Sequence, residues 1–215
     1  MIKNIIILLG LPGSGKGTQG EFISKELAIP HISTGDILRK MVNEGCKDSE
    51  LLATYMKEGK LIPDNLVNKL VKNFILSDTC KHGCVLDGYP RNLRQAEYFI
   101  ENIDANISTI FFDVSDDIAT KRILGRVACA SCNKVYNKYF DKPKKQDVCD
   151  KCGSKEFISR SDDDKDTILL RLEEYKNNTL PMVEYYKKHG KFFTVPAGES
   201  IKKVTEEVAS IIKKI

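Results

Sequence analysis

The sequence lacks a long hydrophobic segment. Its apolar run near the N-terminus, residues 5–9, has five residues with Lys3 ahead of it. A membrane-spanning helix needs about 20 apolar residues, and a secretion signal needs an apolar stretch of about 7 to 15. Internal repeats and low-complexity tracts are absent as well. We therefore expect a cytoplasmic protein without a membrane partner.

A strong excess of either charge is also missing. The 34 basic and 30 acidic residues leave a formal net charge of +4. Such a balance does not require a nucleic acid or an anionic surface as a partner. The 215 residues fit one α/β domain with insertions, and they are enough to bury a substantial core.

The cysteines do not form an even set for disulfide bonds, because there are seven of them. Disulfides are also rare in the reducing compartment that we expect. Two Cys-x2-Cys pairs, Cys129 with Cys132 and Cys149 with Cys152, are separated by sixteen residues. This spacing is typical of zinc ribbons, and four thiolates would complete the closed tetrahedral shell of a structural Zn²⁺ ion. Iron is the alternative metal, and disulfides within or between the pairs are the alternative chemistry.

The segment around these pairs, from residue 125 to about residue 164, is rich in Cys, Lys and Asp and poor in aliphatic residues. It cannot belong to the main core, so we expect an insertion that a metal ion must order. Zinc ribbons often bind nucleic acids, but aspartates dilute the lysines here. The candidates for base stacking are limited to Tyr136, Tyr139 and Phe140. We expect no nucleic-acid partner.

A glycine-rich loop at residues 10–18 follows the apolar run and precedes a helical pattern. In such a strand, loop and helix, backbone N–H groups cradle a polyphosphate and Lys16 reaches its outer phosphates. The usual motif has Ser or Thr directly after the lysine to meet Mg²⁺. Here Gly17 takes that place and the hydroxyl is on Thr18, so Mg²⁺ needs a further ligand from elsewhere.

Extended and helical patterns alternate along the rest of the chain. We expect further strands at residues 29–33, 83–87, 109–114 and 192–195, the second of which ends at Asp87. Pro63 and Asp64 are predicted to open an amphipathic helix with an acidic cap, and Ser200 to cap the last helix. This alternation predicts a five-stranded parallel sheet with helices on both faces.

Many arginines lie near the predicted ligand edge of this sheet. They are Arg39, Arg91, Arg122, Arg126, Arg160 and Arg171. A phosphate loop alone does not distinguish a GTPase, an ATPase and a small-molecule kinase. One nucleotide hardly needs so many cations, whereas phosphoryl transfer between two phosphate-bearing substrates does.

Several motifs together give a family resemblance. They are residues 10–18, residues 33–36 with Arg39, residues 86–91 with Gln95, residues 125–127, the two cysteine pairs with Val135 and Tyr136 between them, and Arg160 with Asp162 and Asp163. With these motifs the sequence resembles the adenylate kinases of the long, zinc-bearing bacterial type. The motifs span nearly the whole chain in the family's order. Glycine after the loop lysine is the family's own form.

The resemblance implies reversible transfer of the terminal phosphoryl group of Mg²⁺-bound ATP to AMP, giving two ADP, in nucleotide biosynthesis and energy homeostasis. It also implies a P-loop kinase fold with three parts. The core would comprise residues 1–32, 63–124 and 164–215, the helical AMP-binding segment residues 33–62, and the zinc-binding lid residues 125–163. A closed lid would keep water from replacing AMP as acceptor.

The family's site residues carry over by position. ATP would be held by Gly13, Ser14, Gly15, Lys16, Gly17, Thr18, Arg122, Arg126, Val135, Tyr136 and the region of Glu199. AMP would be held by Thr34, Arg39, Lys60, Leu61, Ile62, Gly88, Tyr89, Pro90, Arg91, Gln95, Arg160 and Arg171. The catalytic set would be Lys16, Arg91, Arg122, Arg126, Arg160 and Arg171, with Asp87 orienting Mg²⁺ through water.

Two alternatives remain open at this point. One is a kinase that acts on another nucleoside monophosphate or uses GTP as donor. The other is a nucleotide-dependent switch whose zinc ribbon binds RNA or protein. We expect a monomer, because no helix pattern shows a surplus apolar stripe.

Overall fold

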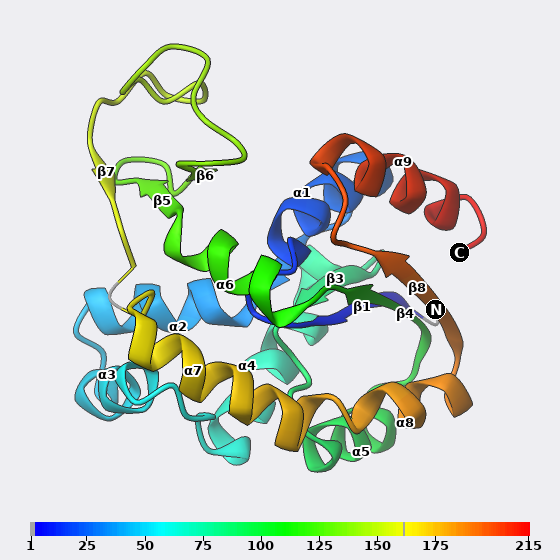
Figure 1. The fold of residues 1–215 in the computed structure, drawn as a ribbon. Coiled ribbons are helices and arrows are strands. Elements are labelled where there is room, and N and C mark those ends of the chain that lie inside the picture. The colour runs from blue at the N-terminus through cyan, green and yellow to red at the C-terminus, as the bar shows by residue number, and fades with distance from the viewer. Residues whose placement is uncertain (1–2, 161) are drawn as a thin grey trace.

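A five-stranded parallel sheet forms the centre of the computed structural model, which describes residues 3–160 and 162–215 (Figure 1). The strands lie side by side in the order β2 (His31–Ser33), β3 (Cys84–Asp87), β1 (Lys3–Gly10), β4 (Ala105–Asp113) and β8 (Lys191–Pro196). The fold class predicted from the alternation of patterns is confirmed. Strand β3 was predicted to begin at Gly83. It begins one residue later, because Gly83 has a φ of +110° that an extended strand does not use.

Helices cover both faces of this sheet. They are α1 (Lys16–Leu27), α2 (Thr34–Asn43), α3 (Ser49–Lys57), α4 (Asp64–Leu76), α5 (Leu93–Asn102), α6 (Asp116–Leu124), α7 (Lys165–Glu174), α8 (Met182–Lys188) and α9 (Ile201–Ile212). A short 3-10 turn (Asp78–Cys80) precedes β3, and a π-helical turn (Tyr175–Thr179) links α7 to α8. Among the described helices, none combines the length and the hydropathy that crossing a membrane requires.

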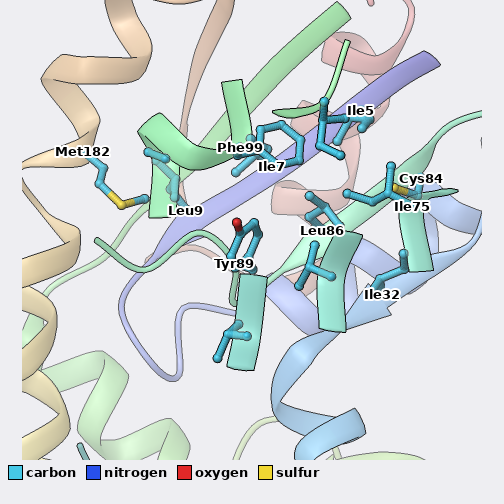
Figure 2. Packing of buried hydrophobic residues seen from close by; sticks show 14 of the residues in the cluster. Ile5, Ile7, Leu9, Ile32, Ile75, Cys84, Leu86, Tyr89, Phe99 and Met182 are labelled. Atoms are coloured by element: carbon cyan, nitrogen blue, oxygen red, sulfur yellow. The ribbon is translucent and has the colours of Figure 1, made fainter. Parts of the chain in front are cut away.

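Alternate side chains of β1 divide the core into two layers. Ile5, Ile7 and Leu9 pack with buried residues of α4, α5 and α8, and Figure 2 shows these three beside Phe99, Leu86 and Met182. Ile6 and Leu8 point to the opposite face, where α1, α6 and α9 supply the partners. Successive residues of a strand face opposite sides, so β1 is apolar throughout because both of its faces are buried.

The start of α4 differs from the prediction. Pro63 occupies the position before the helix and offers no side-chain cap, while Asp64 is the first helical residue. The Asp64 carboxylate instead accepts hydrogen bonds from Asn92 and Gln95, which belong to a later segment. The acidic-cap prediction is therefore wrong. The Ser200 cap is confirmed, since its hydroxyl accepts from the N–H of Lys203.

A second, smaller sheet projects away from the main body at the upper left of Figure 1. It is antiparallel, with β5 (Arg126–Cys129) between β6 (Val135–Asn137) and β7 (Phe157–Ile158). Its own buried cluster consists of Cys129, Tyr136 and Cys149. So small an apolar cluster cannot hold the segment by itself, which leaves the thiols as the main source of order.

Candidate functional site

A cleft of about 800 Å³ opens at the carboxyl edge of the main sheet. Its walls come from the loop after β1, the ends of β2 and β3, the N-terminal part of α2, the lid strand β6 and the helix α7. Ligands of open parallel sheets collect at this edge, because the loops there converge where the strand order reverses. The cleft joins segments that lie more than 150 residues apart in the sequence.

The glycine loop forms the floor of the cleft. Gly15 has a φ of +93° and immediately precedes α1, so the first turn of the helix, whose N–H groups have no partner within it, begins at the cleft lining. Gly13 has a φ of +81°, and a Cβ there would lie 2.5 Å from the carbonyl oxygen of Ala119. Only glycine fits at Gly13, because α6 packs directly against the loop.

Lys16 lies inside this loop. Its ammonium donates to the carbonyl oxygens of Gly10 and Leu11 at 2.7 and 2.8 Å, and to the Ser14 hydroxyl at 3.3 Å. Burial lowers the pKa of Lys16 to about 8, a shift that Asp87 opposes and Arg91 reinforces. The lysine is therefore mostly charged at pH 7, but at a cost that a bound anion would remove.

All six predicted arginines line this one cleft. Aspartates neutralise four of them. Arg126 pairs with Asp163, and its Nε lies 2.7 Å from that carboxylate. Arg171 pairs with Asp162 at 3.0 Å and with Asp163 at 3.3 Å. Asp36 accepts from Arg39 at 2.5 Å and from Arg160 at 3.1 Å.

Positive charge remains crowded in spite of these pairs. Burial, with Arg126 and Arg39 nearby, lowers the pKa of Arg160 to about 10. The pKa of Arg91 also falls to about 10, because the cleft walls limit its hydration and Arg171 lies close, although its side chain remains open to the cleft. Cations that repel one another in a partly dehydrated cavity form a strong site for a polyanion.

Asp87 ends β3 beside the glycine loop. Its carboxylate lies 3.6 Å from His31 Nε2, and both side chains are 14% exposed. Burial opposes ionisation of this carboxyl, but His31 and Lys16 keep the pKa of Asp87 below its usual value. The Asp87 carboxylate and the Thr18 hydroxyl both line the cleft. Such hard oxygen ligands suit Mg²⁺.

A smaller pocket of about 70 Å³ adjoins the cleft between α2, α4 and α5. It is lined by Thr34, Gln95 and the predicted segment Lys60, Leu61 and Ile62. The Thr34 hydroxyl donates to the Gly88 carbonyl at 2.8 Å, which ties α2 to the end of β3. The pocket is therefore continuous with the arginine cluster, through Arg39, Arg91 and Arg171.

At the opposite end of the cleft, Arg122 spans from α6 to the loop after β8. Its guanidinium donates to the carbonyl oxygens of Ala197 at 2.7 Å and Glu199 at 3.1 Å. Arg122 and Glu199, both predicted to contact ATP, thus lie together. The carbonyl oxygen of Arg122 also accepts from the Asn137 side chain of β6 at 2.8 Å.

Two tyrosines that were predicted to bind nucleotides, Tyr89 and Tyr136, are largely buried. Tyr89 packs in the core against Phe99 and is not among the residues lining either cavity, while its neighbours Gly88, Pro90 and Arg91 are. Tyr136 touches the cleft, but its ring is buried in the lid and its hydroxyl reaches Cys149. Tyr136 therefore presents only a small part of its surface to the cleft.

The four lid cysteines lie in one cluster. Their sulfur atoms all lie within 4.8 Å of one another, with 3.5 Å between Cys129 and Cys152 and 3.6 Å between Cys132 and Cys149. A tetrahedron of sulfurs about 2.3 Å from a central ion has edges of about 3.8 Å, so the cluster fits a metal ion. No disulfide forms among the seven cysteines, all of which lie in the described part of the chain.

Tyr136 supports this thiol cluster. Its hydroxyl donates to Cys149 Sγ at 3.5 Å and accepts from the N–H of Asp150 at 2.7 Å. Burial opposes ionisation of Cys149, but this hydroxyl and two backbone N–H groups hold the pKa of the thiol at about 6. A metal ligand must be a thiolate, so the surrounding hydrogen bonds favour the binding form.

The sequence did not reveal every residue that organises the site. The sequence pattern did not predict that His31 would lie beside Asp87. It also did not predict which arginines would pair with Asp36, Asp162 and Asp163, although these aspartates lie in the family motifs. The partner of Asp64 was also missed. The ion pairs could have been predicted from the acidic residues that lie within motifs rich in arginine. No nearby sequence pattern predicts the partners of His31 and Asp64.

Comparisons with known proteins point to one family. The family model described as adenylate kinase matches residues 8–191. The chain is 47% identical to an adenylate kinase of Rickettsia africae over 209 residues, which cover 97% of this chain and 99% of that protein. It is 46% identical to an adenylate kinase of Rickettsia conorii and 45% identical to one of Rickettsia akari, with the same coverage.

We expect replacement of Cys129 and Cys132 by serine to abolish metal binding and to lower the melting temperature, because the lid has little apolar surface to replace the ion. Metal content by atomic emission and unfolding by calorimetry measure the two effects. Cys46→Ser is the matched control, since Cys46 lies outside the lid and is only partly buried. The metal assignment would be contradicted if the purified wild-type protein contained no metal and chelators did not change its melting temperature.

Proposed function

This chain belongs to the adenylate kinase family, and we propose that its arginine-lined cleft holds Mg²⁺-ATP and AMP end to end, with the residues named above in the roles the family gives them. The chain is an ATP:AMP phosphotransferase, which converts ATP and AMP reversibly into two ADP. The observation that carries the site assignment is the convergence of six arginines and Lys16 on one cleft with two ends.

The two ends of the cleft suit two different nucleotides. The glycine loop, Arg122 and the lid residues Val135 and Tyr136 surround one end, which we assign to ATP. The smaller pocket beside Thr34 and Gln95 is assigned to AMP, with Arg39 and Arg91 at its phosphate side. The phosphates of both nucleotides would then meet at Lys16, Arg91, Arg160 and Arg171, where the positive charge is most crowded.

The chemistry asks little of the protein beyond position and charge. The bond between the terminal phosphorus of ATP and its bridging oxygen breaks, and a bond from that phosphorus to a phosphate oxygen of AMP forms. The attacking oxygen is already ionised, so no general base is required. Arginine forks hold the donor and acceptor oxygens in line and balance the charge that spreads over the transferred group. Mg²⁺, when bound, supplies further charge neutralisation, and Asp87 with Thr18 would hold it.

The lid makes this transfer selective over hydrolysis. A closed lid brings Arg126 and Arg160 against the phosphates and excludes water, which would otherwise accept the phosphoryl group. We propose that the ion in the thiol cluster is Zn²⁺ and that it stiffens the lid without touching the reaction. Residues 125–163 would then move as the lid, residues 33–62 as the AMP-binding segment, and the remainder as the core. Residues 1 and 2 of that core lie outside the described structure.

A cluster of four thiols without a disulfide favours a reducing cytoplasm, and we expect the protein to act as a monomer without nucleic-acid or membrane partners. Sedimentation equilibrium tests the oligomeric state.

A coupled assay tests the site assignment. We expect ADP to form from ATP and AMP at many turnovers per second, and a mimic of two adenosines joined by five phosphates to occupy both ends of the cleft and abolish turnover. The mimic should displace ATP and AMP together in a competition experiment. Displacement of one nucleotide with retention of the other would contradict the end-to-end arrangement.

Arg91→Lys tests the arginine fork. The Nε of Arg91 donates to the Gly88 carbonyl at 2.8 Å, which leaves its terminal nitrogens for phosphate. Lysine cannot do both, so we expect the turnover number to fall roughly ten- to a thousandfold with the fold intact. Arg94→Lys is the matched control, because Arg94 is 83% exposed and should change turnover less than about twofold. Equal turnover in both variants would remove Arg91 from the mechanism.

The pKa of Lys16 gives a dependence on pH. Since burial lowers this pKa to about 8, the free protein loses the Lys16 charge as pH rises through 8, and bound phosphate restores it. The affinity for ATP should therefore weaken above pH 8, by up to about tenfold per pH unit, with proton uptake on binding. Titration calorimetry in two buffers of different ionisation enthalpy measures both. In Lys16→Arg the slope should vanish; the same slope there would assign it to another group.

A further inference from the structure

We propose that Asp64 determines which base the monophosphate pocket accepts, by holding the carboxamide of Gln95 in one of its two orientations. The inference rests on the proposed function, because it concerns the base of the acceptor nucleotide.

Both polar atoms of the Gln95 carboxamide are held by hydrogen bonds. It is 1% exposed and lines the smaller pocket. Its Oε1 accepts from the backbone N–H of Arg91 at 2.8 Å, and its Nε2 donates to Asp64 Oδ1 at 2.8 Å. A backbone N–H can only donate and a carboxylate can only accept. A rotated amide would place donor against donor and acceptor against acceptor, so the observed orientation is imposed by its partners.

Asp64 is itself held in place. Its Oδ1 also accepts from Asn92 Nδ2 at 2.8 Å, and its Oδ2 lies 3.2 Å from Arg94 Nε. Asn92 in turn accepts from the N–H of Gln95 at 2.8 Å, which caps α5. Each of these three contacts of the Asp64 carboxylate is therefore with a hydrogen-bond donor. A satisfied network of this kind is rigid, because moving one member leaves another unpaired.

The fixed amide defines a pattern for the base. One hydrogen of Nε2 and one lone pair of Oε1 are used by the protein, which leaves one of each for the pocket. This adjacent acceptor and donor match the 6-amino group of adenine and a neighbouring ring nitrogen. Hypoxanthine and guanine present the reverse, a 6-oxo acceptor beside an N1–H donor, and would leave buried groups unpaired. Cytosine shares the adenine pattern, so its exclusion must come from size.

The test compares AMP with inosine monophosphate, which differ in the 6-amino and 6-oxo groups and the adjoining ring proton. The measured quantity is the ratio of kcat/KM for the two acceptors, with ATP as donor. In Asp64→Ala the Gln95 amide loses its acceptor and one of its two constraints. We expect the ratio of AMP to inosine monophosphate to fall about tenfold or more, while the KM for ATP is unchanged.

Three further variants sharpen the experiment. Asp64→Asn should keep the wild-type ratio, because the two donors at Oδ1, Asn92 and Gln95, require an oxygen there, whereas the exposed Arg94 can turn to solvent. Asp64→Ser should lower the ratio as alanine does, since the shorter side chain has one hydroxyl that donates as well as accepts. Arg94→Ala is the matched control. It removes the exposed ion pair of Asp64 without touching Gln95, and should leave the ratio unchanged.

The outcomes separate this inference from the proposed function. A folded Asp64→Ala or Asp64→Ser protein that loses kcat/KM equally for both acceptors, with an unchanged ratio, would show a merely structural role and overturn the inference. A lowered ratio in Asp64→Asn equal to that of alanine would overturn it too. Failure of the wild-type protein to phosphorylate AMP would instead refute the proposed function.

Discussion

The repulsion among the cations of the cleft is the constraint on which the rest of the site depends. Six arginines and one lysine line one cavity, in which their hydration is limited. Asp36, Asp162 and Asp163 relieve part of that repulsion, and the phosphates of bound nucleotides would relieve more of it. In the proposed mechanism, substrate binding and closure of residues 125–163 would therefore be coupled electrostatically. Arg126 and Arg160 already share the cleft with the other cations, and the carboxylates of Asp163 and Asp36 supply their counter-charge.

The protein uses two different sources of order for its two tasks. The main sheet is stabilised by apolar layers on both faces, so it holds the glycine loop and the strand ends in fixed positions. The lid has an apolar cluster of only three buried residues in its described part, and its cysteine sulfurs are gathered for a metal ion. A flap made rigid in this way can move as one piece, because its own order does not depend on contact with the body.

The sequence predicted those parts of the protein that local patterns encode. The five strands are apolar runs, the glycine loop has a required spacing, and the cysteine pairs have another, so each was visible without tertiary information. Partners across the fold were not. Asp64 before an amphipathic helix has the pattern of a cap, and its true partner Gln95 lies 31 positions away. Tyr136 was predicted to contact ATP, and it does line the cleft. Its burial in the small sheet was not predicted, because strand alternation alone does not say which face is covered.

The two-sided burial of β1 has one more consequence. Its odd-numbered side chains belong to one layer and its even-numbered side chains to the other, and the phosphate loop begins where the strand ends. Inserting or deleting a single residue within this strand would exchange the two layers and carry the loop about 3.3 Å along the sheet. The length of β1 thus sets the position of the phosphate loop. Substitutions of side chains could not compensate for an insertion or a deletion in this strand.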